Sequence, residues 1–270
     1  MMELPQILQA IGLSVGFVIA VEAWHAKGGT RESAAARLIL AAPLIFAGGK
    51  AWYLVENRLP PSSANLLSSG YSLFGSLLLV LLFWALWSRL RPFPLLRFLD
   101  AVTPAAAAGL VFGRLSCYLR GCCSGLPTDL AWGIRLDRSA ELFSDYVVRG
   151  WTDASLRQTV PLHPTQLYEA AFAAVAFFLL RYASDKGLRD GRVCLVGALS
   201  YGFFRLVVEP FRIHTTAPTT VGSLFTAQWA ALIATVAAAA GLWVLGRREP
   251  LLKPGDRLED RASRGNSPLP

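Results

Sequence analysis

Charged residues are scarce in this sequence. Asp, Glu, Lys and Arg make up 16% of its 270 residues, whereas average soluble proteins carry about 25%. Apolar residues account for 54% of the chain, and the mean hydropathy is +0.43. This composition excludes a disordered chain, a basic nucleic-acid-binding domain and most soluble enzymes. It is typical of an all-α polytopic membrane protein, so we expect a lipid bilayer and no nucleic acid as its surroundings.

The features of a cleavable signal peptide are also missing. Met1, Met2 and Glu3 provide no basic region, and no A-x-A-type cleavage site follows the first apolar run. We therefore expect that run to be a retained transmembrane helix.

Seven apolar runs are long enough to span a bilayer, which requires about 20 residues. They cover residues 5–24, 34–55, 70–88, 95–115, 164–183, 192–210 and 221–246. The fourth run is diluted by Asp100, Pro104 and four alanines. We predict a seven-helix membrane domain over 1–246, with a small extracytoplasmic insertion at about 116–162 between spans four and five. Residues 247–270 are predicted to form a disordered cytoplasmic tail.

The net charge of +8 comes from 26 Lys and Arg against 18 Asp and Glu. In short connections between apolar runs, the positive-inside rule and anionic headgroups explain such residues. One side carries most of them: Lys27, Arg31, Arg89, Arg91, Arg97, Arg181, Lys186, Arg189, Arg192 and the tail's Arg247, Arg248 and Lys253. We expect that side to be cytoplasmic, with the N-terminus outside and the C-terminus inside. Within the insertion, the alternating residues 132–137 predict a short strand.

The sixth run contains charged residues, although one at a membrane helix centre costs about 2.5–3.5 kcal/mol on insertion scales. Spacings of i, i+4, i+8 and i+11 predict one helical stripe for Tyr201, Arg205, Glu209 and Arg212. Arg205 and Glu209 can form an ion pair along this stripe. Two interpretations stay open: an ion pair that holds helices together, and a phosphate site in which two arginines bind bidentately.

The start of the fifth run is unusually polar, with His163, Gln166, Tyr168 and Glu169. Pro164 favours a helix start at this point. Glu169 would then lie near the positive end of the helix dipole. His163, Gln166 and Glu169 are three residues apart, so we expect them to share a side. Such a group at the mouth of a membrane helix indicates function.

Three of the four cysteines cluster after the fourth run. They are Cys117, Cys122 and Cys123. An oxidising compartment would permit a disulfide, and Arg114 and Arg120 could lower the pKa of a catalytic thiol. Simple packing is a further interpretation. The C-x4-C-C spacing fits no common zinc pattern, and His163 would have to complete a site. We therefore expect neither a metal nor a cofactor.

Together these motifs resemble the prolipoprotein diacylglyceryl transferase family. In the family's order they are Gly113-Arg114, Gly125-x-Pro127-Thr128-Asp129, Trp132-Gly133, His163-Pro164-Thr165-Gln166-Leu167-Tyr168-Glu169 and Tyr201-Gly202-x-x-Arg205-x-x-x-Glu209-x-x-Arg212. The resemblance implies a bacterial inner-membrane enzyme. It would move a diacylglyceryl group from phosphatidylglycerol to the lipobox cysteine of a prolipoprotein signal peptide, releasing glycerol phosphate.

The resemblance also implies roles for individual residues. Arg114 and Arg205 would bind the phosphate and stabilise charge as it departs. His163 would be the base that generates the acceptor thiolate. The residues implied to bind or position the substrate are Tyr201, Gln166, Tyr168, Glu169, Glu209, Arg212 and Gly125. Of these, Glu209 and Arg212 would orient Arg205.

Four positions depart from the family's pattern. After Gly-Arg the family has asparagines and a glutamate, where this chain has Cys117, Arg120 and Cys122. The family's Ser-Phe-His-Gly-Gly run is here residues 72–76, with Phe74 in place of the histidine. Phenylalanine can neither bind phosphate nor move a proton. Three interpretations follow: diacylglyceryl transfer supported by His163 and the arginines, a divergent lipid-headgroup transferase with another acceptor, and a non-enzymatic lipid-binding membrane protein.

Overall fold

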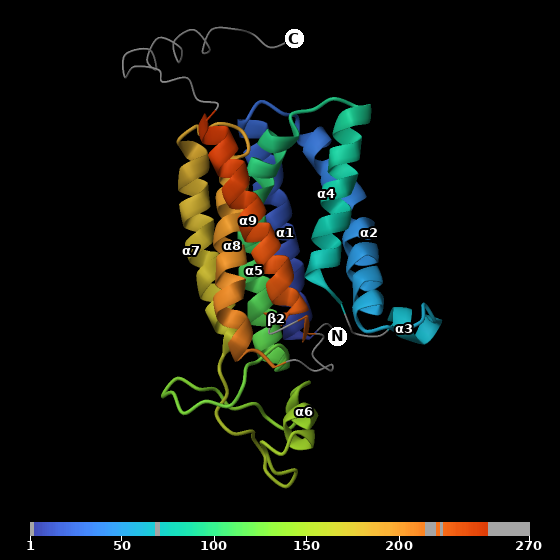
Figure 1. Cartoon of the computed structure of the whole chain (residues 1–270), viewed down its shortest axis with the longest axis vertical. Coiled ribbons are helices and arrows are strands. Elements are labelled where there is room, and N and C mark those ends of the chain that lie inside the picture. Colours follow the sequence, from blue (N-terminus) through green and yellow to red (C-terminus); the bar gives the residue numbers. More distant parts are fainter. Residues whose placement is uncertain (1–2, 68–70, 214–219, 222–223, 248–270) are drawn as a thin grey trace.

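A computed structural model describes residues 3–67, 71–213, 220–221 and 224–247. Within these residues, seven helices are long and apolar enough to cross a membrane (Figure 1). They are α1 (Leu4–Ala26), α2 (Arg31–Glu56), α4 (Leu73–Leu90), α5 (Leu95–Arg120), α7 (Thr165–Asp185), α8 (Arg192–Val208) and α9 (Thr226–Arg247). The prediction of seven spans is confirmed. The predicted tail lies outside the described residues, apart from Arg247.

The remaining elements are short. They are α3 (Ser63–Leu67), α6 (Phe143–Val148), the 3-10 helix η1 (Glu209–Phe211) and the antiparallel pair β1 (Thr220–Val221) and β2 (Leu224–Phe225). Large apolar side chains are exposed along the outer faces of the long helices, for example Leu82, Phe178 and Ile233. An apolar exterior of this extent is suited to lipid. The chain is therefore an all-α, multi-pass membrane protein.

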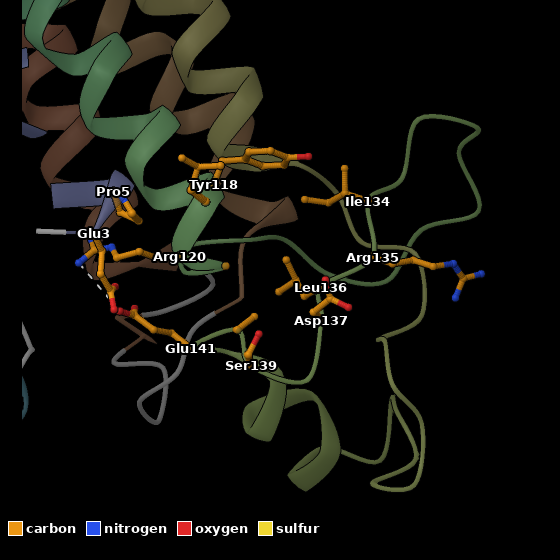
Figure 2. A pocket seen from close by; sticks show the side chains of 13 residues that line it. Glu3, Pro5, Tyr118, Arg120, Ile134, Arg135, Leu136, Asp137, Ser139 and Glu141 are labelled. Carbon is orange, nitrogen blue, oxygen red and sulfur yellow. Dashed lines mark ion pairs between the residues drawn. The ribbon is translucent and has the colours of Figure 1, made fainter. Parts of the chain in front are cut away.

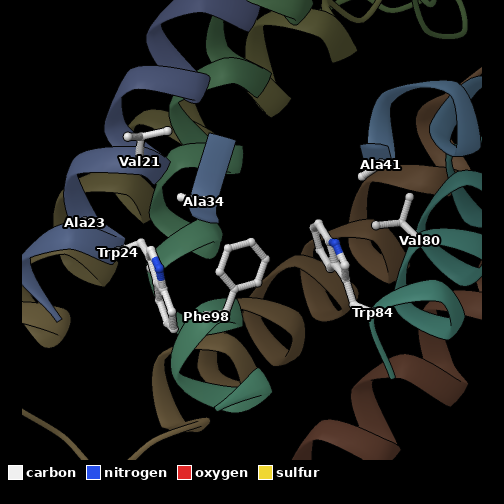
Figure 3. Close-up of a cluster of buried hydrophobic side chains, with 9 residues drawn as sticks. Val21, Ala23, Trp24, Ala34, Ala41, Val80, Trp84 and Phe98 are labelled. Carbon is white, nitrogen blue, oxygen red and sulfur yellow. The ribbon is translucent and has the colours of Figure 1, made fainter. Parts of the chain in front are cut away.

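The long helices pack as two groups joined at one end. Helix α5 lies against α1 and α7, α8 packs along α9, and α2 pairs with α4 (Figure 1). The backbones of α2 and α4 are in direct contact, because a Cβ on Gly75 would lie 2.2 Å from the Gly48 carbonyl oxygen. An aromatic cluster joins the groups (Figure 3): the Phe98 ring lies 5.3 Å from Trp24 and 5.1 Å from Trp84, both edge-to-face.

Helix α5 continues to Arg120, beyond the expected end at residue 115. It ends at Gly121, whose φ of 64° forms a left-handed C-cap. Asp100, which made this span look polar, is a tertiary cap: its buried carboxylate accepts hydrogen bonds from the Gly191 and Cys194 amides at 2.7 and 2.8 Å. Asp100 thereby gives the N-terminus of α8 the hydrogen-bond acceptors that its own N-cap residue, Gly191, lacks.

The insertion between α5 and α7 is mostly irregular. The strand expected at 132–137 is not formed; Ile134 makes only an isolated bridge with Leu162, and Asp137 another with Gln158. Between them, the Leu136 amide donates to the hydroxyl of Thr159 rather than to a backbone carbonyl. This side-chain acceptor interrupts the ladder and explains the missing strand.

The two ends of the bundle are distinct (Figure 1). The insertion lies at the same end as the start of α1, because the Ser116 hydroxyl donates to the Pro5 carbonyl at 2.8 Å. At the other end Arg97 pairs with Asp190 at 3.0 Å. The insertion end also carries the predicted functional residues.

Candidate active site

Glu169 lies at the centre of the candidate site. It is 0% exposed, on the second turn of α7. Arg114 from α5 places Nη2 2.8 Å from Glu169 Oε1. Arg205 from α8 and Arg212 beyond η1 each place Nη1 3.5 Å from Oε2. Three guanidinium groups from three parts of the chain therefore meet on one buried carboxylate.

Two further groups complete this cluster. The Tyr201 hydroxyl donates to Glu169 Oε1 at 2.8 Å. Arg205 also forms a short ion pair with the buried Glu209, as its i, i+4 spacing predicts. Three arginines and two glutamates leave a formal charge of +1 in a buried environment, which favours an anionic ligand. We call Arg114, Glu169, Tyr201, Arg205, Glu209 and Arg212 the arginine cluster.

The predicted stripe on α8 is only partly present. Tyr201 and Arg205 lie on the helix, but α8 ends at Val208 and a 3-10 turn follows over Glu209–Phe211. Pro210 has no amide hydrogen for a continuing helix. Arg212 has extended backbone angles (φ −89°, ψ 148°), so the prediction that it continues the stripe is wrong. It meets Arg205 at Glu169 instead.

Gln166 contacts the loop that follows α5. It is 0% exposed, and its side-chain amide donates to the Cys122 carbonyl at 2.7 Å. The neighbouring Thr165 hydroxyl donates to the Cys123 carbonyl at the same distance. The start of α7 therefore fixes the loop that follows α5. This role of Thr165 cannot be predicted from the sequence, because its partner, Cys123, lies far away in the chain.

Gly125 lies where three segments cross. Its amide donates to the His163 carbonyl at 2.9 Å, and its carbonyl accepts from the Tyr146 hydroxyl at 2.6 Å. A Cβ at this position would lie 2.4 Å from the Phe211 carbonyl oxygen. Only glycine fits without moving one of these segments. Its contacts position the backbone around the site.

Gln166 and Glu169 lie three residues apart on α7 and are both buried, but His163 does not belong to this helix as expected. His163 precedes α7 by two residues, so helical spacing does not apply to it. Its ring packs 5.0 Å from Phe211, and its Nδ1 lies 3.4 Å from the Tyr168 hydroxyl. That hydroxyl also accepts from Trp132 at 2.8 Å. Partial burial lowers the pKa of His163, so its imidazole is neutral at pH 7.

The three clustered cysteines are also brought together. Their sulfur atoms lie within 4.8 Å of one another, and all are free thiols. Hydrogen bonds from the Cys117 and Cys122 thiols, together with Arg212 and Arg114, lower the pKa of Cys123. Cys194 lies apart, on α8 beside Asp100. The thiol cluster therefore borders the arginine cluster.

A cavity of about 440 Å³ opens beside the last turn of α5 (Figure 2). Tyr118, Arg120, Leu136 and Glu141 line part of it, and Arg120 faces Glu141 at 3.9 Å. Cavities of this size accommodate small ligands or peptide side chains. Residues 118–121, which line it, lie between Cys117 and Cys122 in the sequence.

The sequence of this chain is similar to those of known proteins over most of its length. A model of the family "Prolipoprotein diacylglyceryl transferase" matches residues 6–244. A relative from Clostridium tetani is 32% identical over 170 residues, covering 61% of this chain and 62% of its own length. One from Bifidobacterium longum subsp. infantis is 26% identical over 83% of this chain and 74% of its own.

A third relative, from Solidesulfovibrio magneticus, is 32% identical over 76% of this chain and 74% of its own length. All three are named phosphatidylglycerol–prolipoprotein diacylglyceryl transferase. The clostridial match spans just under two thirds of that protein. Because the family model covers most of this sequence, from α1 to α9, the chain belongs to the prolipoprotein diacylglyceryl transferase family.

Proposed function

We propose that this protein transfers the diacylglyceryl group of phosphatidylglycerol to the lipobox cysteine of prolipoprotein signal peptides in a bacterial inner membrane. The observation that carries the proposal is the convergence of Arg114, Arg205 and Arg212 on the buried Glu169. The names of the relatives supply the substrate class. Complementation of a strain depleted of its own transferase tests the activity in cells.

The proposed reaction displaces a phosphate from carbon. The acceptor thiolate forms a bond to the glyceryl carbon, the bond from that carbon to the phosphate oxygen breaks, and its electron pair leaves with glycerol phosphate. Arg114 and Arg205 bind the phosphate and stabilise the charge that it gains. Glu169 and Glu209 hold the two guanidinium groups in place before the lipid enters, so little reorganisation accompanies the reaction.

His163 is the proposed base for the acceptor thiol. Its lowered pKa keeps it neutral and able to accept a proton at pH 7. Tyr168 lies within reach of its ring and orients it. Tyr201, Gln166 and Gly125 act as positioning residues through their contacts with Glu169, the Cys122 carbonyl and the His163 backbone.

Replacing His163 by Gln is expected to reduce transfer at least about 100-fold, the usual contribution of a general base. The assay combines phosphatidylglycerol with a lipobox peptide. Wild-type transfer is expected to fall with decreasing pH only below 6.5, because the lowered pKa keeps the base neutral down to that range. His25→Gln, altered at the other end of α1, is the matched control and keeps full activity.

Replacing Phe74 by His is expected to leave transfer unchanged or to raise it, because the present site works without a histidine there. Phe74 is the observation that favours the second candidate function, a lipid-headgroup transferase with another acceptor. That alternative predicts no transfer to a lipobox peptide by the wild type, and therefore nothing for His163→Gln to remove. The same assay, run on both variants, separates the two functions.

We also propose that the insertion is extracytoplasmic, with the N-terminus outside and the C-terminus inside. The supporting observation is that short-loop Lys and Arg gather at the opposite end of the bundle. A cysteine at the exposed Val148 on α6 is expected to react with an impermeant maleimide in intact cells, above the parent chain's labelling. A cysteine at the exposed Leu188 should react only after lysis. Labelling of Leu188→Cys from outside would reverse the orientation.

A further inference from the structure

The thiol cluster has nearly the dimensions of a metal site. Cys117, Cys122 and Cys123 hold their sulfur atoms within 4.8 Å of one another. In a tetrahedral zinc site with Zn–S bonds of about 2.3 Å, the sulfur atoms lie about 3.8 Å apart. A small inward movement of the three side chains would therefore close the site around an ion.

The loop that carries Cys122 and Cys123 is held in place by hydrogen bonds that do not involve their thiol groups. Gln166 and Thr165 fix the carbonyls of Cys122 and Cys123 from the start of α7. Cys123 has a φ of 60°, a left-handed conformation that favours glycine. A cysteine that served only as packing would gain nothing from this strain. Its presence there indicates that the sulfur atom is needed.

The surrounding charges suit bound thiolates. Three thiolates and one divalent cation carry a formal charge of −1. Arg120 follows Cys117 by three residues at the end of α5, and its only described ion pair, with Glu141, is long at 3.9 Å. Arg114 and Arg212 both contact Glu169 on α7, and the first residue of that helix, Thr165, holds the Cys123 carbonyl. Thiolate ligands at this place are therefore balanced by guanidinium groups.

We propose that Cys117, Cys122 and Cys123 bind one thiophilic divalent cation of the Zn²⁺ class, and that its fourth position takes the acceptor thiol. The unusual C-x4-C-C spacing predicts no metal, but the left-handed turn at Cys123 brings the thiols together. Among the described residues no fourth Cys, His, Asp or Glu joins the group. Three-ligand zinc sites keep an open position for an external ligand.

The proposal deepens the proposed function and rests on it. A thiol bound to a divalent cation loses its proton at neutral pH; here the proton passes to His163. The thiolate then attacks the glyceryl carbon as described, and the metal does not change its oxidation state. The cavity of about 440 Å³ beside Arg120 and Gly121 gives the acceptor room to approach. Because Phe74 stands where the family has a histidine, a bound metal would help to remove the proton from the acceptor thiol in the absence of that histidine.

Metal content tests the site without reference to activity. The full chain, purified in detergent after growth with zinc, is expected to contain about one zinc per molecule. Cys117→Ser, Cys122→Ser and Cys123→Gly should lose it, whereas Cys194→Ser, the matched control outside the cluster, should keep it. Cys123→Gly relieves the positive φ, so metal loss there is not explained by misfolding. A wild type that contains no metal, or a disulfide within the cluster, would overturn the site.

Substituting Co²⁺ for zinc allows the fourth coordination position of the metal to be tested by absorption spectroscopy. The thiolate-to-cobalt absorption of the Co²⁺-loaded chain should increase by about one third when a lipobox peptide adds a fourth thiolate to three. The same peptide with Ser in place of Cys should cause no change. An unchanged spectrum with the Cys peptide would overturn acceptor binding.

Transfer measured on the same samples separates this proposal from the proposed function. Peptide coordination without transfer from phosphatidylglycerol would refute the function and leave the metal site standing. Full transfer by the metal-free cysteine variants would refute the metal's role and leave the function standing.

Discussion

Arg205→Lys is expected to reduce diacylglyceryl transfer at least about 100-fold while the chain still inserts into the membrane. Lysine keeps the positive charge but loses the planar fork of donors. Arg205 uses that fork to contact Glu169 and Glu209 at once, and a bound phosphate would require a further donor in the same plane. Steady-state transfer to a lipobox peptide, with inserted protein quantified in parallel, measures the loss.

The matched control is Arg97→Lys, which changes an ion pair with Asp190 at the opposite end of the bundle. It should keep near-normal transfer. If Arg205→Lys also kept near-normal transfer, Arg205 would only hold helices together, which is the alternative interpretation of this ion pair. A phosphate role also predicts that the loss appears mainly in kcat, because the fork acts on charge that develops as the phosphate leaves.

The parts of this site that follow one helix could be predicted from the sequence. The i, i+4 spacing of Arg205 and Glu209 predicts their ion pair, and the length and hydropathy of the apolar runs predict the spans. Helical spacing places Arg212 wrongly, because Pro210 ends the regular helix before it. Helical spacing is informative only as far as the helix continues. For α5 the error is the opposite one, because this helix extends to Arg120, beyond its expected end at residue 115.

The tertiary parts of the site were beyond sequence reasoning. Glu169 gains its central position from three segments that are distant in the chain, although one signal was available: it is the only carboxylate in the predicted span 164–183, opposite arginines in other spans. The thiol cluster depends on a backbone angle at Cys123 that spacing does not reveal. The family was nevertheless predictable, because the resemblance to it is carried by short local motifs.

Glu169→Gln should destabilise the protein and abolish transfer. The substitution preserves size but leaves Arg114, Arg205 and Arg212 with Glu209 as the remaining carboxylate of the cluster, raising its formal charge from +1 to +2. Removing one partner from a buried ionic group costs about 3–5 kcal/mol. We therefore expect a lower Tm in detergent and little inserted protein. Glu22→Gln is the control, since Glu22 pairs with Arg31 at an exposed position and its loss should change Tm little.

Measuring Tm with added anion distinguishes a purely structural role of the arginine cluster from a role in binding phosphate. If the arginine cluster binds phosphate, glycerol phosphate should raise the Tm of Glu169→Gln more than that of the wild type, because an anion that binds the folded state stabilises it and the variant lacks one internal anion. The Arg205→Lys chain should show a smaller rise than the wild type. Equal rises in all three chains would place the phosphate elsewhere. A Glu169→Gln protein with normal Tm and normal transfer would show that the three arginines do not depend on this carboxylate and that Glu169 is not the centre of the site.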